Sequence, residues 1–185
     1  MKQRFIGYSC VVVLLSVVFA GRLLAASTPG TRSLTGLKSV RIVVEDLNRD
    51  MQALGLHKEQ LHALAAQQLS KDGFTVIGPQ DPTKVPIVYV RLSSVIGGAG
   101  KDAPASFYLT VQVKQLAMLT QGAASTCQAA AAPETPSFLV TTWERGNMAM
   151  VDRTELLFYT QRILINLLGE LATDQKEASG LAQGE

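Results

Sequence analysis

Histidine and cysteine are scarce in this chain of 185 residues, which contains two of each. The two histidines, His57 and His62, stand five residues apart, and on a helix this spacing turns their side chains about 140° away from each other. They cannot bind one metal ion from one helix face, and no pair of cysteines completes a ligand set. We predict no metal site, with His57 as a helix cap and His62 as a surface residue.

The two cysteines, Cys10 and Cys127, do not make a disulfide framework. Cys10 lies inside an apolar segment near the start of the chain, ahead of most of that segment, so it is not placed as a lipidated cysteine. If the segment is removed, Cys127 is the only thiol left in the chain. A lone thiol cannot cross-link its own domain, which leaves two alternatives: an exposed free thiol or a disulfide between two chains.

The sequence also lacks a nucleotide-binding or catalytic motif. Residues 97–102, GGAGKD, resemble a phosphate-binding loop only superficially, because they are expected to connect two strands and no helix follows them. The serines near the predicted strands have no base, since both histidines lie on or beside the first predicted helix. We predict no catalytic residue and no cofactor.

Acidic residues cluster in one place, where Glu45, Asp46 and Asp50 follow the first predicted strand. Paired carboxylates for acid–base catalysis look like this in a sequence, but so does an exposed loop whose acids form turns and helix caps. A small exported hydrolase that uses Asp46 and Asp50 is therefore kept as an alternative function.

No acidic residue precedes Glu45, and the chain begins with a basic and then an apolar segment. Lys2 and Arg4 precede residues 5–20, which carry no charge. A basic start, an apolar centre and small residues beyond it are typical of a secretory signal peptide, here with cleavage after Ala20 or Ala26. The alternative is an uncleaved membrane anchor, although about 16 apolar residues are fewer than the roughly 20 that a spanning helix needs.

Positive charge is modest in the predicted mature protein. Removal of residues 1–26 takes away three of the 17 basic residues, which leaves 14 basic and 15 acidic residues and a net charge of −1. Such a domain lacks the excess of Lys and Arg that neutralises nucleic-acid phosphates. We predict no nucleic-acid partner and no polybasic membrane patch, with membrane contact only if the N-terminal segment is retained.

The remainder of the chain predicts one domain with less ordered segments around and within it. Residues 27–36 are small and polar and predict a spacer, and the domain follows over residues 37–172. Residues 120–136 are low in complexity and predict a mobile loop. The polar residues 173–185 predict a disordered tail.

Alternation and helical periodicity predict the elements of this domain. The first strand alternates from Val40 to Val44, and the helix after it ends at Gly73. The last helix begins after Asp152, which is spaced with Glu155 as a capping pair. Further strands are expected at residues 74–77, 87–93, 105–118 and 137–144, with a turn at residues 145–147. The expected fold is α+β, a mostly antiparallel sheet of about five strands in the order β-α-β-β-β-β-α with two helices on one face.

The apolar residues of the last helix cover an arc about twice the roughly 100° of an ordinary surface helix. We interpret part of this arc as a face for an envelope protein or for self-association. The residues predicted for this partner face are Leu157, Leu164, Leu168 and Leu171.

Five short segments carry a resemblance to known proteins: Val44-Glu45-Asp46-Leu47, Leu54-Gly55-Leu56, Lys58-Glu59-Gln60-Leu61, Gly73-Phe74-Thr75-Val76 and Thr141-Thr142-Trp143. With the order of elements, they resemble small exported bacterial α+β domains. The layout is also similar to the modules at the amino end of the periplasmic protein of the Tol-Pal system and in curli-secretion-type lipoproteins. The resemblance covers about residues 37–172 and implies binding to envelope proteins or self-assembly rather than catalysis.

We therefore expect a non-catalytic binding or assembly module of the cell envelope, exported to the periplasm or the extracellular space. The alternatives are the small hydrolase described above and a membrane-tethered display domain that keeps its N-terminal helix.

Overall fold

The computed structural model describes residues 32–98, 103–118 and 137–181. The predictions of a signal peptide at residues 1–26, of a mobile loop at residues 120–136 and of two alternatives for Cys127 lie outside the described residues.

Strands and helices follow one another along the described residues in nearly the predicted order. The strands are β1 (Ser39–Val44), β2 (Thr75–Val76), β3 (Ile87–Ile96), β4 (Pro104–Met118) and β5 (Ser137–Asp152). The helices are α3 (Arg49–Ala53), α4 (Lys58–Lys71) and α5 (Leu156–Leu181), with a 3-10 turn (Arg153–Glu155) ahead of α5.

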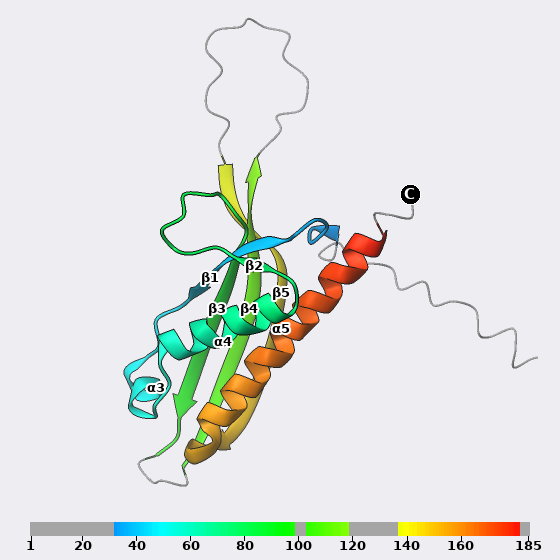
Figure 1. The fold of residues 1–185 in the computed structure, drawn as a ribbon. Helices are drawn as coiled ribbons and strands as arrows, with labels where there is room; N and C mark the ends of the chain where they lie inside the picture. Colours follow the sequence, from blue (N-terminus) through cyan, green and yellow to red (C-terminus); the bar gives the residue numbers. More distant parts are fainter. Residues whose placement is uncertain (1–31, 99–102, 119–136, 182–185) are drawn as a thin grey trace, which may run out of the picture.

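The strands form one sheet in the order β2-β1-β3-β4-β5 (Figure 1). β1 pairs in parallel with both β2 and β3, whereas β3, β4 and β5 pair in antiparallel fashion. The sheet is therefore mixed, which corrects the prediction of a mostly antiparallel sheet. The connection from β1 to β2 runs through α4 and returns the chain in the same direction. β3 then lies beside β1, which adds a second parallel pair that the sequence does not indicate.

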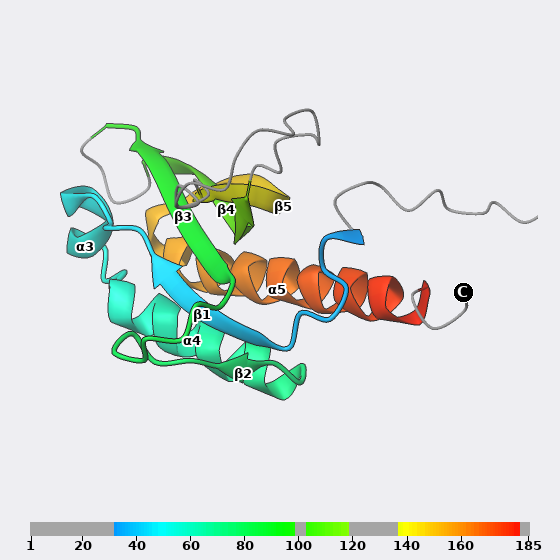
Figure 2. The same ribbon diagram turned by 90° about the horizontal axis from the view of Figure 1, so that it is seen from above.

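α4 and α5 lie on the same face of the sheet, as expected (Figure 2). α4 contacts β1 and β2, α5 contacts β4 and β5, and the two helices contact each other. We call the face that they cover the inner face. No helix of the described residues covers the opposite, outer face (Figures 1 and 2).

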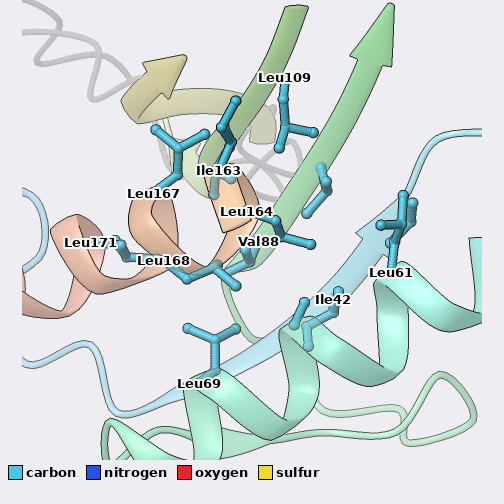
Figure 3. Close-up of a cluster of buried hydrophobic side chains, with 14 of the residues drawn as sticks. Ile42, Leu61, Leu69, Val88, Leu109, Ile163, Leu164, Leu167, Leu168 and Leu171 are labelled. Carbon is cyan, nitrogen blue, oxygen red and sulfur yellow. The ribbon is translucent and has the colours of Figure 1, made fainter. Parts of the chain in front are cut away.

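The hydrophobic core lies between the inner face and the two helices (Figure 3). Val88 and Leu109 from the strands and Leu61 and Leu69 from α4 are buried in it. The buried residues of α5 include Ile163, Leu164, Leu167, Leu168 and Leu171. Since α5 packs against the sheet on one side and against α4 on another, the wide apolar arc of this helix is filled by contacts within the chain.

β5 is longer than predicted, because the residues expected to form a turn at 145–147 belong to the strand. Gly146 lies opposite Thr110 on β4, and a Cβ atom at Gly146 would lie 2.5 Å from the Tyr108 Oη. This glycine makes room for the side chain of a neighbouring strand instead of turning the chain.

Two residues predicted to cap helices stand at the N-cap positions, but their side chains make no capping hydrogen bond. His57 is the N-cap residue of α4, and Asp152 is the N-cap residue of the 3-10 turn before α5. Neither side chain makes a capping hydrogen bond. The start of α5 is therefore not set by an Asp152–Glu155 capping pair.

Both ends of the domain extend beyond the predicted limits. The predicted spacer contains Leu34, whose side chain is fully buried, so residues 32–36 belong to the domain. The predicted disordered tail is helical to Leu181, and Ala178 is buried in the core. The Thr35 hydroxyl donates a hydrogen bond to the Ala178 carbonyl oxygen at 3.4 Å, which joins the two ends. The polar composition of both segments suggested that they lie outside the domain. Both predictions are wrong because the few apolar residues in each segment pack on the core.

Candidate interaction surface

The outer face of the sheet carries a group of exposed apolar side chains that sequence analysis did not single out. Two rows of cross-strand neighbours form it: Val95, Ser106 and Met150 in one row, and Ser93, Tyr108 and Met148 in the next. The side chains of Val95, Met148 and Met150 are 73–75% exposed, and Tyr108 is 46% exposed. We call Val95, Tyr108, Met148 and Met150 the outer patch.

A second exposed apolar group lies at the far end of β4 and β5. β3 begins at Ile87, which pairs with Lys114, and β4 and β5 continue together beyond that row (Figure 1). The exposed residues of this extension are Leu116, Met118, Phe138, Leu139 and Val140. We call these five residues the hairpin end. In sequence they look like ordinary strand residues, because only the late start of β3 shows that no third described strand pairs with the extension.

Charged and aromatic residues occupy the outer face between these two groups. Arg91 Nε lies 3.3 Å from Glu45 Oε2, and the ammonium group of Lys114 lies 3.7 Å from the centre of the Tyr89 ring. Burial, and secondly the nearby Glu45 carboxylate, raises the pKa of Tyr89. The outer face therefore has a polar centre and two separate apolar regions.

The acids proposed for a hydrolase are not brought into one site. Lys58 Nζ donates a hydrogen bond to Asp46 Oδ1 at 2.6 Å, and this bond lowers the pKa of Asp46. Asp50 lines a hollow of about 260 Å³ beside Arg153, and Asp46 does not line it. An acid held in its ionised form cannot donate a proton at neutral pH, so Asp46 is unsuited to the general-acid role.

The residues predicted for a partner face lie together, but inside the chain's own core. Leu164, Leu168 and Leu171 have no exposed surface, and Leu157 is partly buried against the core. The large exposed apolar residues of α5 are instead Phe158, at 60%, and Ile165, at 37%. No helix in the described part of the chain is both long enough and apolar enough to cross a bilayer.

A polar contact joins the last helix to the edge strand β5. Trp143 Nε1 donates a hydrogen bond to Asp174 Oδ2 at 2.8 Å, and Arg145 Nη2 lies 3.4 Å from the same oxygen. Trp143 is 5% exposed and belongs to the core. The role of Asp174 could not be predicted, because the sequence after residue 172 predicts disorder. These contacts fix β5 to α5 without assembling reactive groups.

No protein-family model matches the sequence, and no curated protein matches it significantly. Among solved structures, the PelC dodecamer from Paraburkholderia phytofirmans is 11% identical, with a TM-score of 0.46, and the match covers 74% of this chain and 88% of that one. The hypothetical protein CT253 from Chlamydia trachomatis is 9% identical, with a TM-score of 0.45 and coverage of 75% and 97%. A minor lipoprotein from Acinetobacter baumannii is 12% identical, with a TM-score of 0.30 and coverage of 80% and 95%. None of these three is named as a Tol-Pal or curli-secretion protein, and at such TM-scores the similarities establish neither a family nor a function for this chain.

Proposed function

We propose that this chain is a non-catalytic binding or assembly module of the cell envelope, and that it binds through the outer patch and the edge strand β5. The observation that carries this proposal is the exposure of Met148 and Met150 on the edge strand β5, which pairs only with β4 among the described strands. Leu164, Leu168 and Leu171 of α5 are buried in the core, and this burial favours the sheet over these leucines as the binding surface.

The outer patch has the chemistry of a protein-binding surface. Clustered exposed apolar residues are uncommon on monomeric proteins and mark interaction sites. Methionine side chains are flexible and polarisable, and they adapt to the shape of a partner. Tyr108 adds an aromatic ring of the kind enriched at protein interfaces.

The edge of β5 also offers backbone N–H and C=O groups with which a strand of another protein can pair. β5 has 16 residues and is the last strand of the sheet, so in the described residues only β4 pairs with it. An exposed edge strand pairs readily with an extended segment of another chain, and neighbouring side chains then give specificity. We infer an extended segment of a second protein as the occupant, lying along β5 with its side chains against Met148 and Met150.

The test is the size of the complex that contains this chain in its host. Met148→Lys combined with Met150→Lys places two charges on the outer patch, and we expect this variant to elute at the size of one chain where the natural protein elutes in a larger complex. Asn147→Lys is the matched control, because Asn147 is exposed on the same strand but alternates to the other face. A double variant that stays in the large complex contradicts the proposal, as does a natural protein found only at the size of one chain.

Export is part of the same proposal, with cleavage of the signal peptide after Ala20 or Ala26. The basic start and the uncharged residues 5–20 support it. The intact mass of the protein from soluble and membrane fractions tests it. A soluble species lacking the first 20 or 26 residues is expected, and a full-length species confined to membranes would instead support the tethered alternative.

A further inference from the structure

The hairpin end differs from the outer patch because its apolar side chains face both ways. Alternation along the strands places Leu116, Met118 and Leu139 on the outer side, and Phe138 and Val140 on the inner side. All five are 38–66% exposed. A protein that packs on a sheet covers one of its faces, whereas a lipid phase surrounds an inserted hairpin on both. The exposure on two sides therefore favours lipid as the occupant.

Basic residues surround the hairpin end. Residues 32–44, 82–90, 111–118 and 137–143 meet in this part of the domain, and they contain five basic residues and no acidic residue. The basic residues are Arg32, Lys38, Arg41, Lys84 and Lys114. The register gathers them, since Arg41 on β1 and Lys114 on β4 both lie opposite Ile87 of β3.

Two described carboxylates near this end of the domain, Asp81 and Asp174, accept hydrogen bonds. Asp81 accepts hydrogen bonds from the backbone N–H and the hydroxyl of Thr83, and these bonds, with the charge of Arg41, lower its pKa. Asp174 accepts hydrogen bonds from Trp143 and Arg145. A lowered pKa keeps Asp81 negatively charged, so Asp81 and Glu144, which lies opposite Gln112, offset part of the five positive charges. The basic residues still outnumber these two acids, which leaves an excess of positive charge among the described residues at this end.

Basic and apolar side chains line the same hollow of about 590 Å³. Arg41 and Lys84 line it together with Leu116 and Leu139. Exposed apolar side chains next to basic residues match the boundary between acyl chains and phosphate groups in a membrane. We propose that this end of the domain docks on a lipid bilayer with anionic headgroups, with the hairpin end in the interfacial layer and the basic residues at the phosphates.

The start of the described chain lies at the same end. The Ser33 hydroxyl donates a hydrogen bond to the Thr142 carbonyl oxygen at 3.1 Å, and Gln115 Nε2 donates one to the Ser33 carbonyl oxygen at 3.0 Å. Whatever precedes Arg32 therefore joins the domain beside the hairpin end. The docking proposed here does not need an anchor.

Two tryptophan variants test the docking. Phe138→Trp and Phe158→Trp add a second indole at exposed phenylalanines, 50% and 60% exposed, in the hairpin end and at the start of α5. The quenching of Trp143 is measured in the natural protein and subtracted from both variants. Protein recovered from the host is mixed with phosphatidylcholine vesicles that contain about 30% anionic phosphatidylglycerol, with bromine on the acyl chains as a quencher. We expect quenching at position 138 and not at position 158. Quenching at neither position, or equally at both, overturns the proposal, and any N-terminal segment is the same in the two variants.

Charge variants test the role of the basic residues. Lys84→Glu with Lys114→Glu is expected to weaken binding to the same vesicles by about tenfold or more, because each basic residue near the surface adds to the attraction. Arg162→Glu changes an exposed basic residue of α5 and is expected to leave binding unchanged. Equal loss in the two variants contradicts docking through the hairpin end. Cross-links between two copies at position 138 without vesicles would identify a second chain as the occupant and overturn the proposal.

Discussion

The contact between Trp143 and Asp174 joins an edge strand to the last helix through a hydrogen bond that is mostly shielded from water. Asp174→Ala leaves the indole N–H without its partner, and the free energy of unfolding is expected to fall by about 1–2 kcal/mol. Glu170→Ala is the control, because Glu170 lies 3.9 Å from Arg145 and both side chains are half exposed. Its effect is expected to stay below about 0.5 kcal/mol in urea denaturation. Equal losses in the two variants would contradict the structural role of Asp174.

The pair formed by Asp46 and Lys58 predicts a pH dependence. The hydrogen bond to Lys58 lowers the pKa of Asp46 below its ordinary value of 3.8, so the folded protein binds this proton more weakly than the unfolded chain. The stabilisation is present above pH 3.8 and is lost as the pH falls through the lowered pKa. The pKa of Lys58 is raised above 10.5 by Asp46, so its contribution is present below pH 10.5 and is lost only as the pH rises past the raised value.

Carboxyl NMR measures this directly. We expect the titration midpoint of Asp46 below 3.8 in the natural protein and a higher midpoint in Lys58→Met. Lys38→Met is the control, since Lys38 does not contact Asp46, and it should leave the midpoint unchanged. An ordinary midpoint in the natural protein would contradict the hydrogen bond between Lys58 and Asp46.

At the scale of elements, α5 is a core helix that packs on both the sheet and α4. Leu168→Asp buries an unpaired charge between these layers, and we expect the domain to unfold, as seen by loss of the cooperative thermal transition. Ile165→Asp places the same charge on the exposed side of the helix, and we expect the fold to be kept. A folded monomer from Leu168→Asp would mean that this leucine belongs to an interface between chains after all.

The elements differ in how far the sequence predicts them. β4 alternates without interruption, and its predicted range of residues 105–118 nearly equals Pro104–Met118. The sequence predicts an end of β5 at residue 144, because a glycine at position 146 suggests a turn. The reason for this glycine is the Tyr108 side chain packed against it, and this tertiary contact cannot be read from the sequence. The last turns of α5 are not predicted, because residues 173–177 are polar and suggest disorder. The contact of Ala178 with the core does not show in such a polar sequence.

At the scale of the whole molecule, the layout of the sheet decides which surfaces are free. The sequence predicts two helices on one face but not that β3 lies beside β1, because a strand's neighbour depends on long-range packing. That placement leaves β5 at the edge, and it leaves the hairpin end beyond the last row of β3. It also gathers five basic residues that are spread over the sequence, which the net charge of the chain could not indicate.

The central claim is that the sheet, and not α5, is the binding surface of this protein. The most direct measurement places a photo-cross-linking amino acid at position 148 on the outer patch or at position 165 on the exposed side of α5, in the host cell. We predict that position 148 gives a cross-linked product with another protein chain and that position 165 gives none. A product at position 165 without one at position 148 would contradict the account.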